Sequence, residues 1–236
     1  MAQNFIVTLD GPAGVGKTTL ARQTAERLGI AYLDTGAMFR TLGLRLAGKV
    51  DVCSEAELAE AARQLSFALE GTGASTAICC NGIAIGPEIR TEEVGMLAAK
   101  VGRIPAVREV LKQAQQALGA RFPLVAEGRD MGTVVFPQAP WKFFLDASPE
   151  VRAQRRLHDL EKLGQQASLA DLVRQIRERD ELDRNRPVAP LKPADDAFVI
   201  DTSALDIQGV LNAILGRING PIHVRDNGHG EGNANG

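Results

Sequence analysis

The chain alternates between short apolar runs and longer segments whose apolar residues recur every three to four positions. The apolar runs predict buried strands at 5–9, 31–33, 123–126, 141–145 and 197–200. The helical spacing predicts helices at 17–28, 37–47, 54–65, 91–101, 105–118, 148–163, 168–185 and 207–218. Because the two kinds of segment alternate, we expect an α/β fold whose parallel sheet is covered by helices on both faces.

Residues 58–101 interrupt this alternation. Short strands are expected there at 66–70, 76–80 and 83–85. Asn81-Gly82 is a strong two-residue hairpin turn, and Ser54 with Glu57 forms a capping box for the preceding helix. We interpret 58–101 as an inserted antiparallel subdomain, which leaves 1–57 and 102–219 as the core.

The last stretch, 220–236, is polar and rich in glycine. Such a composition cannot bury enough apolar surface to pack, so we expect a flexible tail. His223 and His229 lie in this tail, and we interpret them as incidental rather than as metal ligands.

The string GPAGVGKT at 11–18 follows the first expected strand and opens the first expected helix. It matches the G-x-x-x-x-G-K-[ST] pattern, in which glycines let backbone N–H groups surround a polyphosphate at a helix N-terminus. We expect Lys17 to reach the β- and γ-phosphates and the Thr18 hydroxyl to hold Mg²⁺. The expected nucleotide-binding residues are Gly11, Pro12, Ala13, Gly14, Val15, Gly16, Lys17, Thr18 and Thr19.

A phosphate-binding loop does not by itself select a reaction. Regulatory GTPases read guanine with an Asn-Lys-x-Asp string, which this sequence lacks. ATPases that remodel other molecules end an apolar strand with a metal-binding acid, and Asp146 after 141–145 resembles that pattern. A strand end before a Ser148 helix cap is the better interpretation of Asp146.

Charge and composition narrow the possible partners and the cellular location. The net charge is −2 and aromatic residues make up 4%, so neither favours nucleic acid or a membrane surface. There is no apolar run of about 18 residues and no signal-peptide pattern. The three cysteines show neither metal spacing nor a disulfide framework. We expect a cytoplasmic protein that binds neither nucleic acid nor membrane.

Basic residues are concentrated late in the chain, where eight of the 20 arginines lie between 152 and 186. The planar guanidinium suits bidentate contacts with phosphate. One interpretation is a solvated helix face, on which neighbours such as Arg179 and Asp183 pair. In a chain with a phosphate loop we favour a mobile lid, at about 152–168, that closes over the phosphates. The lid arginines expected to share one helix face are Arg152, Arg155 and Arg156.

Several strings together resemble the bacterial cytidylate kinases, members of the nucleoside-monophosphate kinase family, over residues 4–218. They are the loop at 11–18, LDTGAMFR at 33–40, EIRTEEV at 88–94, GRDMGTVVFP at 128–137 and RDELDRNRPVAPL at 179–191. The resemblance implies a five-stranded parallel sheet, a nucleotide-binding insert and a short arginine lid over ATP. It also implies a monomer that converts CMP or dCMP and Mg·ATP to CDP or dCDP and ADP.

The same resemblance implies roles for individual residues. Arg40 and Arg129 would hold the monophosphate, while Arg108 and Asp130 would face cytosine. The sugar and its neighbouring phosphate would be covered by Thr35, Arg179, Asp183 and Arg186. The catalytic cations would be Lys17, Arg129, Arg155 and Arg156.

The sequence departs from the family pattern at a few positions. Ala99 stands where a serine is common, Phe39 where a tyrosine is usual and Glu127 where an aspartate is common. Two other functions stay open. One is a kinase with another acceptor, such as UMP, AMP or a non-nucleotide, which would be favoured if Arg108 and Asp130 do not face a base. The other is an ATP sensor that transfers no phosphate, and the arginines argue against it.

Overall fold

The computed structural model describes residues 5–162 and 164–219. The tail expected at 220–236, with His223 and His229, therefore lies outside the described residues, as does Leu163 at the expected end of a helix. No helix in the described part of the chain combines the length and apolarity needed to cross a membrane.

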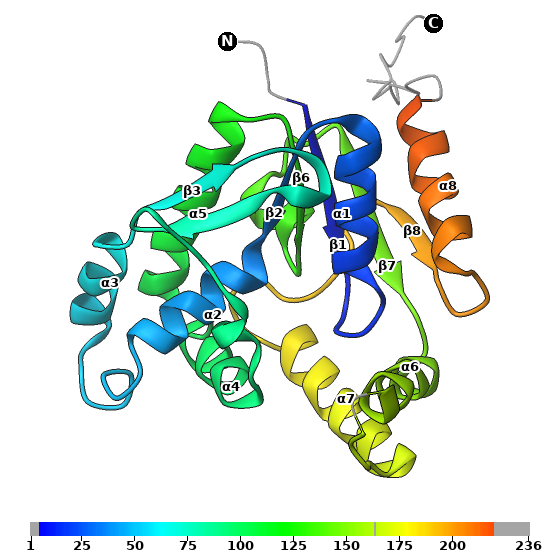
Figure 1. Cartoon of the computed structure of the whole chain (residues 1–236). Helices are drawn as coiled ribbons and strands as arrows, with labels where there is room; N and C mark the ends of the chain where they lie inside the picture. Colours follow the sequence, from blue (N-terminus) through cyan, green and yellow to red (C-terminus); the bar gives the residue numbers. More distant parts are fainter. Residues whose placement is uncertain (1–4, 163, 220–236) are drawn as a thin grey trace, which may run out of the picture.

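A five-stranded parallel sheet forms the centre of the molecule (Figure 1). Its strand order is β2-β6-β1-β7-β8, so the first strand of the chain lies in the middle. The strands are β1 (Ile6–Asp10), β2 (Ala31–Asp34), β6 (Leu124–Gly128), β7 (Trp141–Asp146) and β8 (Phe198–Asp201). All five were predicted from their apolar runs, with ends that differ by one or two residues, and the parallel α/β expectation is confirmed.

The eight predicted helices are all present. They are α1 (Lys17–Leu28), α2 (Thr35–Arg45), α3 (Glu55–Arg63), α4 (Glu92–Val101), α5 (Pro105–Arg121), α6 (Pro149–Lys162), α7 (Leu169–Arg184) and α8 (Ile207–Asn219). Helix α2 begins two residues before its predicted start because the Asp34 carboxylate accepts a hydrogen bond from the Ala37 amide. The predicted capping box of α3 is also present, since Ser54 and Glu57 bond reciprocally.

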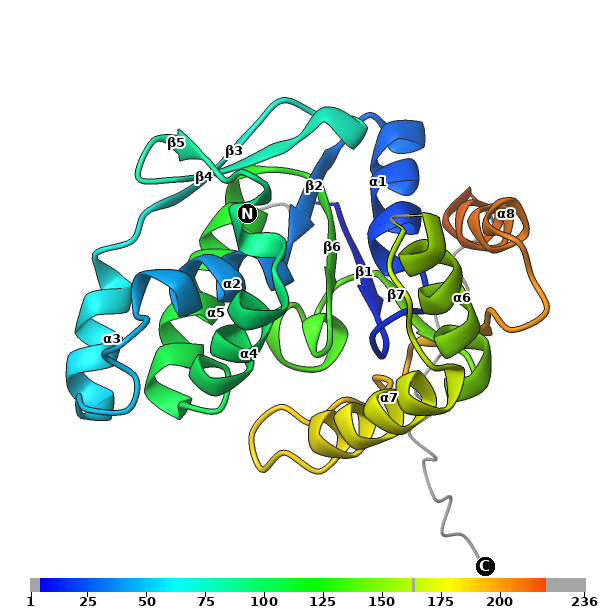
Figure 2. The same ribbon diagram turned by 60° about the horizontal axis from the view of Figure 1, so that its bottom comes forward.

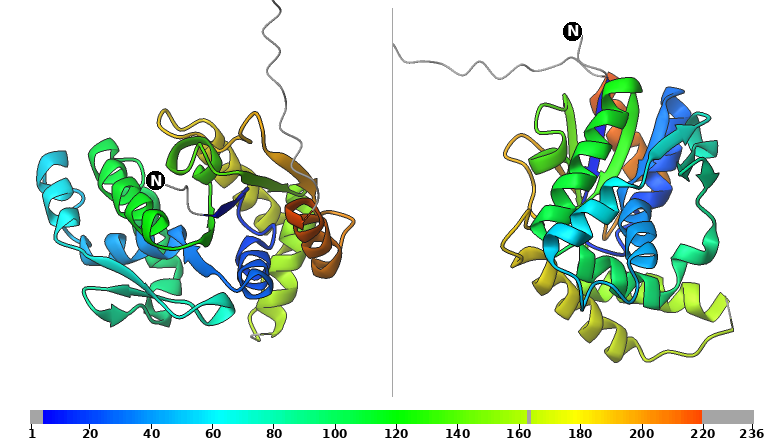
Figure 3. Two further views of the ribbon diagram at one scale, coloured as in Figure 1. Left: turned by 90° about the horizontal axis from the view of Figure 1, so that it is seen from above. Right: turned by 90° about the vertical axis from the view of Figure 1, so that its left-hand side faces the viewer.

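The two faces of the sheet bury different residues because side chains alternate along each strand. Leu33 and Leu124 pack with α2 and α5, whereas their neighbours Tyr32 and Val125 pack with α1 and α8. Figure 3 shows α5 on one side of the sheet and α1 on the other. The sheet therefore fixes where α1 begins, and with it the phosphate-binding loop.

A second sheet, of three antiparallel strands, is formed by β3 (Phe67–Glu70), β4 (Ala77–Cys80) and β5 (Ile83–Ala84). The predicted turn between β4 and β5 is confirmed, with φ of 52° at Asn81 and 76° at Gly82. Leu69 and Ile78 of this sheet belong to the same apolar cluster as Leu33 of the large sheet. The expected boundary at 58 falls inside α3, so the inserted subdomain at 58–101 stays a prediction.

Three short helical turns were not predicted. They are η1 (Gly73–Ser75), η2 (Pro87–Arg90) and η3 (Met131–Val135). Turn η3 follows β6 directly, at the carboxyl edge of the sheet. Figures 1 and 2 show α6 and α7 packed across this same edge.

Leu111 on α5 tests whether one apolar cluster joins the two sheets, because it is 1% exposed within that cluster. We expect Leu111→Ala to lower the free energy of unfolding by about 2–5 kcal/mol, through lost burial and a cavity. Urea unfolding followed by far-UV circular dichroism measures it. The control is Val52→Ala, at a side chain that is 80% exposed, which should change stability by less than about 0.5 kcal/mol. Equal effects of the two substitutions would contradict the shared core.

Candidate active site

One continuous cleft of about 880 Å³ lies at the carboxyl edge of the parallel sheet. The phosphate-binding loop lines one end, and side chains from α2, α4, α5 and α7 line the other. Seen from this edge, α7 crosses in front of the sheet and α4 lies on the opposite side of the cleft (Figure 2). Open α/β sheets bind their ligands at this position.

The phosphate-binding loop needs its glycines for two different physical reasons. A Cβ on Gly11 would lie 2.1 Å from the Leu145 carbonyl oxygen of β7, a contact that no other residue type can avoid. Gly14 and Gly16 adopt φ of 83° and 89°, in the left-handed region that favours glycine. The loop therefore lies against β7 and presents backbone N–H groups at the start of α1.

Lys17 is buried at the first turn of α1. Its Nζ donates to the carbonyl oxygens of Gly11 and Pro12, at 2.8 and 2.6 Å. Burial, and then the charge of Arg129, lowers the pKa of Lys17 well below its usual range. A buried cation in this state gains most from a nearby anion, which favours phosphate at this end of the cleft.

Glu127, near the end of β6, joins three of the elements around the loop. Thr18 Oγ1 donates to Glu127 Oε2 at 3.1 Å, and the Tyr32 hydroxyl donates to Glu127 Oε1. Burial, and then the charge of Asp34, raises the pKa of Glu127. Thr35, expected near the sugar or phosphate, donates its hydroxyl to the Glu127 carbonyl oxygen at 2.7 Å and also lines the cleft.

Asp10, the last residue of β1, holds the loop that follows β6. Its two carboxylate oxygens accept from the Met131 and Gly132 amides at 2.9 and 2.7 Å. Burial raises the pKa of Asp10 to about 6, although these two hydrogen bonds oppose the shift. The residues just before this anchored turn are Arg129 and Asp130, so their backbone position depends on Asp10.

Asp130 lies between two arginines. Arg108 Nη2 donates to Asp130 Oδ2 at 2.5 Å, and Arg186 Nη2 lies 3.6 Å from Oδ1. The Arg108 guanidinium also lies over the Phe39 ring, 5.4 Å from its centroid, and donates to the Gly102 carbonyl oxygen. Arg108 and Asp130 thus bond each other, a pairing that was not predicted, and their expected place beside cytosine stays a prediction.

Arg129 pairs with Asp183 through its Nε, at 2.9 Å. The spacing of Arg179 and Asp183 would allow them to pair, but Asp183 hydrogen-bonds to Arg129 instead. Both charges nevertheless act on Asp183, because Arg129 and then Arg179 lower its pKa against the effect of burial, which raises it. The hydrogen-bond partner of Asp183 comes from the loop after β6, which helical spacing cannot reveal.

Several guanidinium nitrogens around the cleft have no hydrogen-bond partner among the described residues. They include the two terminal nitrogens of Arg129, all three of Arg179 and Nη2 of Arg40, whose Nη1 donates to Ile89 and Thr91 carbonyls. Nη2 of Arg186 is buried and also lacks a hydrogen bond. Arg179 is exposed and Arg40 and Arg129 are half-buried, so their unpaired nitrogens open into the cleft that all four arginines line. Several unpaired guanidinium donors around one cleft favour an anionic ligand.

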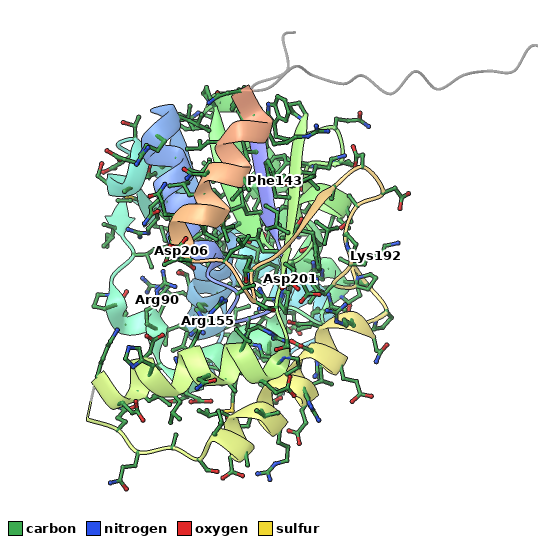
Figure 4. All side chains as sticks on the ribbon, turned by 90° about the vertical axis from the view of Figure 1, so that its right-hand side faces the viewer. Arg90, Phe143, Arg155, Lys192, Asp201 and Asp206 are labelled. Atoms are coloured by element: carbon green, nitrogen blue, oxygen red, sulfur yellow. The ribbon has the colours of Figure 1, made fainter. Side chains whose placement is uncertain are left out.

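The three arginines of α6 lie within one continuous helix, with the spacing that was expected to put them on one face, but their surroundings differ. Arg152 is 1% exposed, and its guanidinium donates to Ala13, Ala147 and Asp180. Arg155 donates to the Thr202 hydroxyl and carbonyl oxygens, at 3.2 and 2.6 Å, and Figure 4 shows it beside Asp201 at the end of β8. Arg156 is exposed. Spacing alone cannot distinguish a buried arginine from an exposed one on the same helix.

The model of the cytidylate kinase family matches residues 7–220. The chain is 56% identical over 218 residues to the cytidylate kinase of Oleidesulfovibrio alaskensis, covering 92% of this chain and all of that protein. It is 58% identical to the cytidylate kinase of Nitratidesulfovibrio vulgaris, covering 90% and 92%, and 47% identical to that of Lawsonia intracellularis, covering 94% and 98%. The chain belongs to the cytidylate kinase family.

Several residues of this cytidylate kinase family site were not predicted from the sequence. Arg90 does not line the cleft itself, but its Nη2 donates to Oδ2 of Asp34, which does, at 2.7 Å; no role was assigned to Arg90 from the sequence. Arg103, Thr202 and Asp206 also line the cleft. The last two follow β8, so their place after a parallel strand was the signal that identifies them.

Tyr32→Phe tests the buried contact with Glu127. The hydroxyl favours the ionised carboxylate, so its removal leaves that charge with one donor fewer and raises the pKa of Glu127 further. We expect a loss of about 1–3 kcal/mol of unfolding free energy at a pH where Glu127 is ionised.

The loss should shrink as the pH falls and Glu127 becomes protonated, because the hydrogen bond stabilises mainly the charged form. Urea unfolding of both proteins at a series of pH values from 8 down to 4 measures the difference. A loss of the same size at every pH would show that the hydroxyl does not act through the charge of Glu127.

Proposed function

We propose that this chain transfers the γ-phosphoryl group of ATP to CMP and dCMP, giving CDP or dCDP and ADP. The observation that carries the proposal is the cleft itself. It joins a phosphate-binding loop at one end to guanidinium groups with unpartnered nitrogens at the other. Two phosphates facing each other across one cleft are what phosphoryl transfer between nucleotides needs.

The acceptor phosphate is proposed to bind among Arg40, Arg129 and Arg179, with the buried Nη2 of Arg186 at its side. Burial, and then the neighbouring charge of Arg179, lowers the pKa of Arg40. Crowded cations repel one another, so a bound phosphate relieves this repulsion while it satisfies the free donors. No general base is required, because the attacking phosphate oxygen is already an anion at neutral pH.

The base is proposed to be read by Asp130 and Arg108. A carboxylate accepts from the cytosine amine and repels the carbonyl that uracil carries there, while a guanidinium donates to the base acceptors. Two such contacts, at about 1–3 kcal/mol each, would favour CMP over UMP by about 10²-fold or more. Ala99 also lines the cleft and has no hydroxyl to add to this recognition.

Mg²⁺ is proposed to accompany ATP. No three His, Cys, Asp or Glu side chains gather as a metal site in the described part of the chain. That fits magnesium, which keeps several waters and takes few protein oxygens beside the substrate phosphates. The Thr18 hydroxyl, which is bonded to the Glu127 carboxylate, offers the oxygen chemistry required. When bound, the ion would neutralise charge on the phosphates.

The remaining catalytic cations are proposed to be Lys17, Arg155 and Arg156. Lys17 lies at the loop, and Arg155 lines the cleft. Arg156 is exposed on α6, and its charge contributes to lowering the pKa of Arg40. The lid at about 152–168 and the inserted subdomain at 58–101 are part of the proposal. A cytoplasmic location, a monomer and the absence of nucleic-acid partners stay predictions from the sequence.

The direct test is ADP production from Mg·ATP with CMP, dCMP, UMP, AMP and GMP supplied separately. We expect CMP and dCMP to exceed UMP by about 10²-fold in kcat/KM, from the two base contacts. Faster turnover of UMP or AMP than of CMP would change the assigned acceptor but would still show that the protein is a kinase. ATP binding with no acceptor-dependent turnover would favour a nucleotide sensor.

Gly95 of α4 leaves room for Arg40, since a Cβ there would lie 3.2 Å from Arg40 Nη2. Gly95→Ala should raise helix stability by about 1 kcal/mol. It should also displace the guanidinium by a fraction of an ångström and lower kcat/KM for CMP about 3–10-fold, because small misplacements at a reacting centre are costly. Thermal unfolding and steady-state kinetics measure these opposite effects.

The matched control is Gly216→Ala in α8, where a Cβ meets nothing within 4 Å. It should stabilise the protein with unchanged kinetics. Unchanged kinetics in Gly95→Ala as well would remove Arg40 from the acceptor site.

A further inference from the structure

Arg152 is a buried charge that connects the phosphate-binding loop to α7. Its Nη1 donates to the Ala13 carbonyl oxygen at 3.1 Å, and its Nε donates to the Ala147 carbonyl oxygen at 2.9 Å. Nη1 and Nη2 also bind both carboxylate oxygens of Asp180 on α7. All three guanidinium nitrogens therefore bind protein acceptors, and Arg152, which is 1% exposed, does not line the cleft where a substrate phosphate would bind.

The side-chain stem of Arg152 is held as firmly as its head. A Cβ on Gly14 would lie 3.4 Å from Arg152 Cβ and within 3.8 Å of Cγ and Cδ. The stem therefore packs against the backbone of the phosphate-binding loop. A two-pronged contact with a carboxylate fixes both the distance and the angle of its partner. Asp180 is thus placed relative to the loop itself.

Helix α7 depends on this contact because little apolar surface holds it. Of all its residues, Leu172 is the one that is buried, and it lies two turns before Asp180. Arg179, directly before Asp180, lines the acceptor end of the cleft. Asp183, one turn later, bonds Arg129. A rotation of α7 about its axis would move both of these groups.

We propose that Arg152 and Asp180 form a positioning pair, which sets Arg179 and Asp183 relative to the phosphate-binding loop and so aligns the phosphoryl acceptor with the donor. The inference rests on the proposed function. The pair touches neither substrate and acts through α7. Removal of the carboxylate charge should therefore weaken acceptor use while it leaves ATP binding intact, because Arg152 keeps both of its carbonyl partners.

A second ion pair between the same two helices provides a matched control. Arg177 of α7 donates to Glu150 of α6 at 2.5 Å, with both side chains more than half exposed. Exposed pairs contribute little to stability or geometry. If α7 only needed any link to α6, Glu150→Gln and Asp180→Asn would have similar effects.

The experiment compares wild-type protein, Asp180→Asn and Glu150→Gln. We expect Asp180→Asn to lower kcat/KM for CMP by about 10–100-fold, the scale of a misplaced reacting group. Its Kd for ATP, measured calorimetrically without acceptor, should stay within about twofold of wild type, as should all constants of Glu150→Gln. Wild-type kinetics in Asp180→Asn, equal effects of the two variants, or parallel losses of ATP and CMP affinity would each overturn the inference.

Asp180→Asn leaves the Arg152 charge buried without its counter-charge, which is costly enough to prevent folding in some proteins. The double variant Arg152→Met with Asp180→Leu avoids this, because apolar replacement of a whole buried pair is often neutral for stability. We expect it to fold and to show the same selective loss with CMP. Wild-type kcat/KM in the folded double variant would overturn the positioning role.

The comparison uses whichever nucleoside monophosphate the wild-type protein phosphorylates best, so a different acceptor base leaves it valid. A wild-type protein that turns over none of them overturns the proposed function and this inference together. Equal turnover of CMP by the wild-type protein and by Asp180→Asn overturns the positioning role alone.

Discussion

Three aspartates hold the arginines at the carboxyl edge of the parallel sheet, and the geometry of the cleft depends on these pairs. Asp130, Asp180 and Asp183 come from the loop after β6 and from α7, and each bonds an arginine of a different element. A buried arginine without a partner is costly, whereas a bidentate partner fixes the orientation of its guanidinium. These pairs place cations where apolar packing alone would leave flexible side chains.

The same pairs leave part of each guanidinium free. Arg129 donates to Asp183 through Nε, so the two terminal nitrogens of Arg129 remain for a ligand. Arg186 Nη2 forms no hydrogen bond, although Asp130 lies nearby. The donor end of the cleft is built differently, from backbone N–H groups that Gly11 allows to lie against β7. A rigid backbone cradle thus faces side-chain cations that are oriented by carboxylates. This division suits a reaction in which one phosphate is held and another must be aligned with it.

Local patterns predicted most of the fold and one end of the site. Apolar runs identified every strand of the large sheet, and helical spacing identified the eight helices. The glycines of the phosphate-binding loop and the Asn81-Gly82 turn carry their conformation in the residue type. Partners far apart in the chain were not predictable in the same way. Arg152 and Arg156 lie four residues apart on α6, and their spacing does not distinguish them. Arg152 is buried against Asp180 of α7, whereas Arg156 is exposed.

The loop after β6 shows the same limit. Its string resembled a known family, but nothing local indicated that Asp10, more than a hundred residues earlier, anchors it through two backbone amides. The bond of Asp183 with Arg129, rather than with Arg179, likewise depends on how α7 lies across the sheet. Residue types at the site were thus predictable, whereas their pairing required the fold.

The position of the CMP phosphate in a crystal of the complex with CMP and a non-hydrolysable ATP analogue tests the central claim most directly. We expect that phosphate within about 3 Å of the terminal nitrogens of Arg129, with Asp183 still bonded to its Nε and the base beside Asp130. A phosphate bound away from Arg129, or a base that contacts neither Asp130 nor Arg108, would contradict the assignment of the acceptor site.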